Sequence, residues 1–480
     1  MSEYKLFVHR IGLIGITQIL VTLSSIILLP ILTKNYSVSD YGIWVQINVT
    51  LILIPPAITL GLQYSMVRFL ASKNKKGDIQ EGFYSVALTV AVISLITAII
   101  LFILSDSIAR IILNSNIAAA KILSFLVFFT ALNLIYLNYF RTFQQMKIYS
   151  VLTLLQTYIM IILTSYIAVS GYSIATALIG ILISQIIVFL MALIIITFNI
   201  SFKIPKFVKI REYLSFGLPT VSSILSYWIV ESSDKYIIGI LLNAAFVGYY
   251  SPSYTLGNLI MMLVFPFTVL LPPLLSQYYD ENKIETVRIF MKYSFKYFLV
   301  LAIPSMVGLS ILSKIIIQIL TTPEIAANGY FVTPFVALSA LLYGIYNIIL
   351  NILIINKKTR IIGMTWVIAA ILNIFLNIVT IPYYGLLGSA VATLAAYVTA
   401  FVITVFYTLK QFRFDFDLIF VLKSVAATVP MSLIIFKFYP TGILSLIVMV
   451  IVGSLIYTAS LFLLKGFKKE EFEFIKTLLK

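Results

Sequence analysis

The feature that most constrains the fold of this chain is a series of apolar segments, each about long enough to cross a bilayer. A helix of ~20 apolar residues spans a hydrocarbon core ~30 Å thick. With 61% hydrophobic and 10% charged residues, the chain has more apolar surface than one soluble core could bury. We therefore expect an all-α polytopic membrane protein. The sequence predicts about fourteen membrane helices, at approximately residues 11–32, 43–67, 83–104, 122–140, 151–169, 173–198, 215–242, 254–276, 293–315, 330–355, 361–381, 386–408, 419–438 and 443–464.

The distribution of basic residues supports this topology and predicts its orientation. If the N-terminus is cytoplasmic, all but six of the 33 Lys and Arg residues fall on the cytoplasmic side, the exceptions being Lys34, Arg110, Lys121, Lys235, Lys314 and Lys437. The positive-inside rule predicts this asymmetry. We expect a multi-pass protein of the cytoplasmic membrane with both termini in the cytoplasm. The net charge of +16 is then a topology signal, and we expect no nucleic-acid partner.

The composition excludes several kinds of site. Cys is absent, and the single His, His9, precedes the first predicted span. Disulfides, thiolate or His-based metal sites and imidazole catalysis are therefore not available. The longest predicted external segment, Ser105 to Lys121, contains one acid, Asp106. We expect neither an enzyme nor a metal centre.

One predicted span carries charges at membrane depth. The segment 215–242 contains three charged residues within one stretch of five: Glu231, Asp234 and Lys235. Each such charge costs roughly 3 kcal/mol on insertion scales, so these groups usually face a protein interior or a watery cavity. Glu231 and Lys235 have the i, i+4 spacing of a helical ion pair. We favour a functional site, and the alternative is a neutralised triad that pins this helix against a neighbour.

A weak internal repeat relates the two halves of the chain, as in many secondary transporters. Gly42-Ile-Trp44 and Gly248-Tyr-Tyr250 lie 206 residues apart, and two short basic links, Phe143 to Ile148 and Asn356 to Ile361, lie 213 apart. We expect two six-helix lobes in parallel orientation, within residues 1–200 and 201–410. Residues 411–480 would add two C-terminal helices and a cytoplasmic tail.

Three further motifs lie at the ends of predicted spans: Pro30-Ile-Leu-Thr-Lys-Asn-Tyr-Ser-Val-Ser-Asp-Tyr-Gly42, Leu214-Ser-Phe-Gly-Leu-Pro219, and Asp234-Lys-Tyr-Ile-Ile-Gly239 followed by Val247-Gly-Tyr-Tyr250. In order, spacing and topology they resemble the polysaccharide-export branch of the MOP superfamily, which includes the Wzx-type flippases of lipid-linked oligosaccharides. The resemblance covers about residues 5 to 464. It implies a MATE/MOP-like, V-shaped pair of six-helix lobes around a central cavity that opens alternately to each side.

The resemblance also implies a function. The cargo would be polyprenyl-pyrophosphate-linked oligosaccharide, moved by alternating access with a coupling H⁺ or Na⁺ and no other cofactor. A charged cavity wall would receive the pyrophosphate and sugar while the prenyl tail stays in lipid. The partners would be the lipid-linked oligosaccharide, membrane lipids and other polysaccharide-assembly membrane proteins. Two alternatives remain, a cation-coupled multidrug exporter of the same superfamily and, less favoured, a membrane glycosyltransferase or glycan polymerase, which would need a larger external loop with catalytic acids.

In that setting Lys235 would donate to a phosphate or sugar oxygen, and Glu231 or Asp234 would take up the coupling ion. We favour Asp234 because it lies in the family-like string. Amides and aromatic rings suit sugar hydroxyls and faces, and basic residues at cytoplasmic helix ends would meet an entering pyrophosphate. The further candidates are Gln18, Gln46, Asn48, Tyr227, Trp228, Tyr254, Asn258, Arg10 and Arg68. For each amide or aromatic residue considered alone, the favoured role is an interhelical hydrogen bond. For each Arg considered alone, the favoured role is a signal for membrane orientation.

Overall fold

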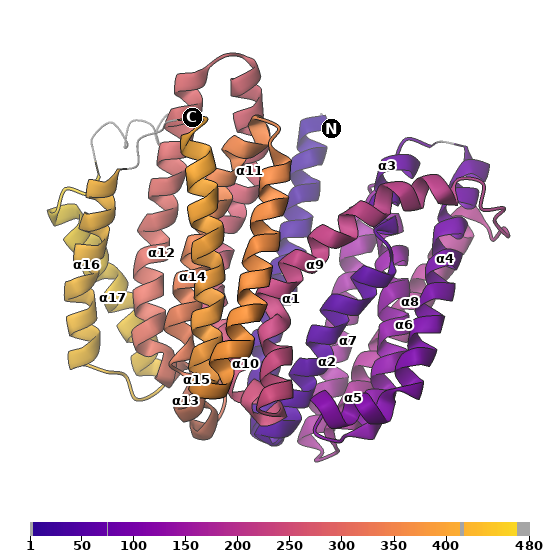
Figure 1. The fold of residues 1–480 in the computed structure, drawn as a ribbon, viewed down its shortest axis with the longest axis horizontal. Coiled ribbons are helices and arrows are strands. Elements are labelled where there is room, and N and C mark those ends of the chain that lie inside the picture. The colour runs from indigo at the N-terminus through magenta and orange to yellow at the C-terminus, as the bar shows by residue number, and fades with distance from the viewer. Residues whose placement is uncertain (1–2, 74, 413–416, 468–480) are drawn as a thin grey trace. The chain divides into compact units, whose positions relative to one another are not determined.

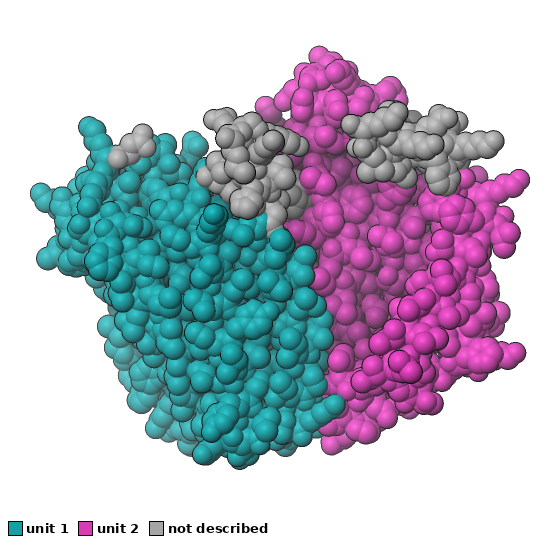
Figure 2. Space-filling view, turned by 180° about the vertical axis from the view of Figure 1, so that it is seen from behind, with its two compact units in different colours: residues 1–248 teal, residues 249–480 magenta. Residues whose placement is uncertain are grey.

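Helices form every regular element of the computed structural model, which describes residues 3–73, 75–412 and 417–467 (Figure 1). The chain divides into two compact units, unit 1 (Met1–Gly248) and unit 2 (Tyr249–Lys480), coloured separately in Figure 2. The helices of unit 1 are α1 (Glu3–Asn35), α2 (Val38–Ile58), α3 (Leu62–Leu70), α4 (Lys76–Ile103), α5 (Ser105–Ile112), α6 (Ile117–Thr142), α7 (Met146–Val169), α8 (Ile174–Ile200) and α9 (Ile210–Leu241). The boundary between the units falls in α10 (Ala244–Asn258), and unit 2 continues with η1 (Leu259–Val264), α11 (Phe265–Asp280), α12 (Ile284–Leu320), α13 (Pro323–Gly329), α14 (Val332–Ile355), α15 (Thr359–Leu409), α16 (Leu418–Lys437) and α17 (Ile443–Leu463).

The prediction of an all-α polytopic membrane protein is confirmed, and the count of fourteen spans is approximate. Twelve helical segments in the described ranges are long and apolar enough to cross a membrane. α15 counts once among them although it contains two predicted spans, 361–381 and 386–408. The charged helix α9 is not among the twelve. The division into lobes 1–200 and 201–410 stays a prediction. In the structure, α9, which begins after residue 200, packs within unit 1 against α2 and α3.

Helix α4 shows why these segments form helices suited to lipid. One face, with Phe83, Val86 and Val90 at helical spacing, is completely buried within unit 1. Another face exposes Ile96 (53%) and Ile103 (72%). In water such an exposed apolar face would favour aggregation, whereas hydrocarbon solvates it at no cost and leaves every backbone group paired within the helix.

Helix α15 consists of two segments that fold back on each other. Gly385 has a φ of 55° and a ψ of −134°, a backbone conformation outside the helical region. Ser389 donates a 2.8 Å hydrogen bond to Oδ1 of Asn377, although twelve residues of straight helix would separate them by ~18 Å. A Cβ on Gly388 would lie 2.6 Å from the carbonyl oxygen of Thr380. Two neighbouring antiparallel spans therefore occupy residues 359–384 and 386–409.

The two C-terminal helices belong to unit 2 and pack on each other and on α12. The buried Lys296 of α12 places Nζ 4.6 Å from the ring centroid of Phe420 and 5.4 Å from that of Phe467. The hydroxyls of Ser424 and Tyr457 join α16 to α17 at 2.8 Å. A cation held against aromatic rings is favoured where water is excluded, so this contact fixes the C-terminal pair to the rest of the unit.

The basic linker before α9 is attached to α4 by one carboxylate. Glu81 accepts hydrogen bonds from the backbone N–H groups of Lys206 at 3.0 Å and Val208 at 3.3 Å. Lys76 adds a bond from Nζ to the hydroxyl of Ser201 at 3.1 Å. Hydrogen bonds to a charged acceptor contribute about 1.5–3 kcal/mol each, so Glu81 holds the linker in one conformation.

We expect Glu81→Ala to expose this linker to protease. Trypsin should cleave after Lys203, Lys206 or Lys209 at least about tenfold faster, because local opening loses charged hydrogen bonds of about 1.5–3 kcal/mol each. Cleavage is measured on inside-out membrane vesicles by the appearance of fragments. Asp78→Ala, which removes an exposed acid one turn earlier, is the matched control. Equal acceleration in both variants contradicts the role of Glu81, and cleavage confined to right-side-out vesicles contradicts the predicted orientation.

Candidate functional site

Helix α9 carries a buried ion pair at the charged segment predicted from the sequence. Asp234 is completely buried and Lys235 is 8% exposed. Nζ of Lys235 lies 3.3 Å from Oδ1 of Asp234, and the same oxygen accepts the backbone N–H of Lys235 at 2.7 Å. Nζ also donates to the backbone carbonyl of Glu231 at 3.3 Å, and Glu231 itself is half-buried. The lysine is thus enclosed between the carboxylate beside it and the carbonyl one turn earlier.

Helix α2 supplies the second wall of this site, through Gln46 and Thr50. Gln46 is completely buried and donates from Nε2 to the backbone carbonyl of Lys235 at 2.8 Å. One turn along α2, the hydroxyl of Thr50 is hydrogen-bonded to the hydroxyl of Tyr236. A Cβ on Gly239 would lie 2.1 Å from Nε2 of Gln46. The glycine that ends the family-like string therefore leaves room for the amide to reach α9.

Two buried polar atoms of this site have no hydrogen-bond partner among the described residues. They are Oε1 of Gln46, an acceptor, and Nε1 of Trp228, a donor. The indole of Trp228 packs edge-on against the ring of Tyr236, with centroids 5.6 Å apart. Buried polar atoms left unpaired cost about 1–3 kcal/mol each. Such atoms beside a buried ion pair mark a place where a polar ligand, ion or water would be stabilised.

The site in unit 1 unites some of the predicted residues but not others. Hydrogen bonds and an ion pair join Lys235, Asp234, Gln46 and the backbone carbonyl of Glu231, and Trp228 packs against Tyr236. Asn48 turns away and donates within α2 to the carbonyl of Trp44 at 2.8 Å. Two further predicted residues, Gln18 on α1 and Arg68 on α3, have exposed side chains. Two others belong to unit 2, where Tyr254 is buried and Asn258 is half-buried. The side chains of Arg10 and Tyr227 lie outside the described residues.

Sequence reasoning missed Thr50 and Tyr236. Both stand at helical spacing from residues that were predicted: Thr50 lies four residues after Gln46, and Tyr236 lies eight after Trp228. Residues four apart share one helix face, so the same faces pointed to them. Thr50 is neither charged, an amide nor aromatic, so it gave no signal of its own, whereas Tyr236 is an aromatic residue of the family-like string and could have been included.

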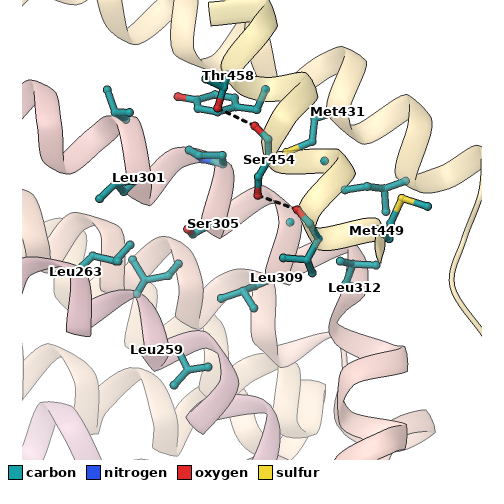
Figure 3. A pocket seen from close by; sticks show the side chains of 18 of the residues that line it. Leu259, Leu263, Leu301, Ser305, Leu309, Leu312, Met431, Met449, Ser454 and Thr458 are labelled. Carbon is teal, nitrogen blue, oxygen red and sulfur yellow. Dashed lines mark hydrogen bonds between the residues drawn. The ribbon is translucent and has the colours of Figure 1, made fainter. Parts of the chain in front are cut away.

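Unit 2 contains an apolar pocket of about 370 Å³ between η1, α12, α16 and α17. Figure 3 shows leucine and methionine side chains, Leu259, Leu263, Leu309 and Met431 among them, around it. The hydroxyls of Ser454 and Thr458 are hydrogen-bonded within α17 to Val450 and Ser454 at 2.7 Å. The wall therefore offers hydrocarbon and suits an alkyl chain.

The site around Asp234 and Lys235 can bind an anion or exchange a cation. Lys235 has three donors and could exchange a protein acceptor for an external oxygen, and Asp234 would then be released to hold a proton or cation. In the described residues no three His, Cys, Asp or Glu side chains are grouped to hold a metal ion.

Comparison with known proteins agrees with this architecture. A family model described as polysaccharide biosynthesis protein matches residues 31–324, more than half of the chain. A "probable low-salt glycan biosynthesis flippase" of Haloferax volcanii is 23% identical over 277 residues, 57% of this chain and 58% of the relative. A "probable flippase" of the same organism is 29% identical over 205 residues, 41% of each chain. The chain thus spans about half the length of the curated relatives it matches.

Solved structures with low sequence identity share the fold. The lipid II flippase MurJ in its inward closed conformation superposes with a TM-score of 0.77 at 19% identity, covering 95% of this chain and 99% of that chain. An inward-facing multidrug resistance MATE family transporter of the MOP superfamily gives a TM-score of 0.64 at 15% identity, covering 84% and 98%. The predicted MATE/MOP-like fold is confirmed.

Proposed function

The chain belongs to the polysaccharide biosynthesis protein family, and from this premise we propose that it is a flippase for polyprenyl-pyrophosphate-linked oligosaccharide. It carries the cargo across the cytoplasmic membrane by alternating access and forms or breaks no bond in it. The names of the Haloferax relatives, both probable flippases, support this proposal. So does the fold, which matches a lipid II flippase along nearly its whole length.

The observation that carries the proposal is the buried pair of Asp234 and Lys235 on α9, in the predicted span 215–242. Ionisable groups there are expensive and are usually retained for transport. Lys235 binds a pyrophosphate or sugar oxygen, and the unpaired atoms of Gln46 and Trp228 add one acceptor and one donor for the glycan. Asp234 takes up the coupling H⁺ or Na⁺ when Lys235 turns to the cargo. Binding of cargo and of ion are coupled because both draw on the same pair.

In this proposal the protein works within a glycan assembly system. Both of its termini are cytoplasmic, and it takes the cargo where cytoplasmic enzymes complete it. Its partners are the lipid-linked oligosaccharide, the surrounding lipids and other polysaccharide-assembly membrane proteins. We propose a coupling H⁺ or Na⁺ and no other cofactor.

Reconstitution into liposomes tests the function directly. Purified protein should accelerate the inward-to-outward movement of a fluorescent prenyl-pyrophosphate oligosaccharide, followed by a membrane-impermeant quencher, relative to protein-free liposomes. Separate collapse of the Na⁺ and H⁺ gradients identifies the coupling ion. Transport of a cationic dye without movement of the glycolipid would instead support the multidrug exporter, which the MATE-like fold permits. Hydrolysis or elongation of the glycan would support an enzyme.

The apolar pocket of unit 2 gives a second prediction, since we propose that it receives part of the prenyl chain. A Cβ on Gly308 would meet no atom within 4 Å, and Gly308 lines the pocket. Gly308→Leu should therefore fold normally and fill the pocket. Flipping of the long-chain cargo should slow about tenfold, because displacing about two CH₂ groups costs ~0.8 kcal/mol each. A farnesyl-linked cargo should be affected less.

The control for this variant is Gly363→Leu. A Cβ on Gly363 would also meet no atom within 4 Å. Gly363 lies on α15, which does not line the pocket. If both variants slow the long-chain cargo equally, or neither does, the prenyl chain does not use this pocket. That outcome would leave the flippase assignment intact, because it is measured independently on wild-type protein.

A further inference from the structure

Unit 2 contains a cluster of four aromatic residues on helices that carry neither the pair of Asp234 and Lys235 nor the apolar pocket. Tyr343 and Tyr346 lie on α14, and Trp366 and Tyr397 lie on the two antiparallel halves of α15. The centroid of the Trp366 ring lies 6.1 Å from that of Tyr343, 5.4 Å from that of Tyr346 and 6.0 Å from that of Tyr397. Tyr343 also contacts Tyr397 at 5.8 Å. The cluster thus joins three membrane-spanning segments.

The indole of Trp366 is held in one orientation. Its Nε1 donates a 2.8 Å hydrogen bond to the hydroxyl of Tyr346. The rings of Tyr346 and Tyr397 meet it at 78° and 87°, the edge-to-face geometry that aromatic quadrupoles favour. Tyr346 and Tyr397 are buried, whereas Trp366 and Tyr343 are half-buried. A fixed indole with part of its surface open is preorganised for a ligand.

Trp366 lies away from the most exposed stripe of its helix. On the first half of α15 the exposed stripe contains Met364, Ile368 and Ile371, at 55%, 45% and 65% exposure. Trp366 lies on the opposite face, in helical register with the completely buried Asn373. Tyr346 lies ~21 Å along α14, near its middle, and not at the helix ends where aromatic belts occur.

Polar groups accompany the rings. Half-buried Asn347 follows Tyr346 on α14 and donates from Nδ2 to the carbonyl of Tyr343 at 2.8 Å. This bond uses an amide donor and leaves the amide oxygen Oδ1 oriented by the helix. The tyrosine hydroxyls add further donors and acceptors. Aromatic faces beside a few fixed polar groups are the usual composition of a site for an amphipathic small molecule.

We propose that this aromatic cluster, Tyr343, Tyr346, Trp366 and Tyr397, is a binding site for a pyranose ring of the cargo. One face of a pyranose presents C–H bonds polarised by neighbouring oxygens, which attract the negative face of an indole, while its hydroxyls suit Asn347 and the tyrosines. The proposal rests on the proposed flippase function and adds to it a glycan contact in unit 2, on helices other than the one that carries Lys235.

Fluorine NMR can observe this contact directly. Protein labelled with 5-fluorotryptophan has three tryptophans, at positions 44, 228 and 366, and the signal of Trp366 is assigned by its loss in Trp366→Phe. The probes are farnesyl pyrophosphate and farnesyl pyrophosphate carrying a disaccharide. The Trp366 signal should shift with the disaccharide probe and not with farnesyl pyrophosphate alone.

Affinity provides the second readout. Trp366→Leu should raise the Kd of the disaccharide probe roughly 3- to 10-fold, and that of farnesyl pyrophosphate by less than about twofold, because only the sugar loses a ring contact. Trp366→Phe, which keeps an aromatic face, should retain most of the affinity. Tyr346→Phe removes the hydroxyl that orients the indole and should weaken sugar binding without changing the farnesyl pyrophosphate Kd.

Two results would overturn the inference. One is an unshifted Trp366 signal in wild-type protein that flips glycolipid in liposomes. The other is an equal loss of affinity for both probes in Trp366→Leu, which would indicate a packing role. If Trp366→Leu does not fold, the wild-type NMR titration still decides. Failure of the flippase proposal is recognised separately, by the absence of glycolipid movement in wild-type liposomes.

Discussion

Asp234→Asn combined with Lys235→Gln is expected to give a folded protein that flips the glycolipid about a hundredfold more slowly than wild type. The double variant removes both charges of a pair joined at 3.3 Å, so neither charge of this pair is left buried without the other. It also removes a charged hydrogen bond to the cargo, which contributes roughly 3 kcal/mol, or about a hundredfold in rate. The measurement combines the liposome assay with thermal unfolding of the purified protein.

The single variants separate a functional pair from a structural one. Asp234→Asn removes the carboxylate that lies 3.3 Å from the buried ammonium of Lys235, and Lys235→Gln removes that ammonium from the buried carboxylate of Asp234. Breaking a buried pair from one side costs about 3–5 kcal/mol of stability. Each single variant should therefore be less stable than the double variant. Transport, in contrast, should stay low in all three.

An exposed pair provides the control. Glu285 and Arg288 form an ion pair at the start of α12, with side chains 75% and 44% exposed. Neutralising both should change stability by less than about 1 kcal/mol and leave flipping unchanged. A double variant of Asp234 and Lys235 that is folded and flips at the wild-type rate would refute the site, and would assign the pair to holding α9 in place.

The second large effect is expected from a single added methyl group, in Gly42→Ala. A Cβ on Gly42 would lie 1.8 Å from the carbonyl oxygen of Ala244, and a Cβ on Gly248 would lie 2.3 Å from that of Val38. Both contacts are with backbone atoms, which cannot rotate away as side chains do. We expect Gly42→Ala to cost more than about 3 kcal/mol and to abolish recovery of monodisperse protein.

Gly77→Ala is the matched control for this change. Gly77 is also helical, but no atom lies within 4 Å of its Cβ position. Its substitution should leave the unfolding temperature in detergent unchanged or slightly raised, since alanine favours the helix. If Gly42→Ala is recovered with the stability of Gly77→Ala, the approach of α2 to the start of α10 is not a requirement of the fold.

The repeat in the sequence gains a physical meaning from these contacts. Gly42-Ile-Trp44 and Gly248-Tyr-Tyr250 match at 206 residues, which indicates only that both begin a helix in similar ways. In the structure each glycine meets the other segment, Gly42 at Ala244 and Gly248 at Val38. A sequence comparison aligns the two segments but contains no information that they touch.

The sequence by itself determined the class of this protein, because bilayer thickness and the cost of charge in hydrocarbon act on every residue independently of its neighbours. These two constraints predict an all-helical membrane protein, most of its spans, and the burial of the charges of Asp234 and Lys235 inside the protein. The family resemblance follows from motifs of the same local kind. All of these properties depend on residue type and position along the chain alone.

Only the tertiary structure decided which side chains complete that site. Gln46 and Asn48 are amides two residues apart, yet Gln46 reaches the carbonyl of Lys235 and Asn48 bonds within its own helix. Helical spacing pointed to Glu231 beside Lys235, and the structure adds an ion pair between Lys235 and the neighbouring Asp234. Thr50 and Tyr236 were brought together in the same way. The physical reason is that these contacts depend on the rotation and approach of α2 against α9, which packing between distant segments sets.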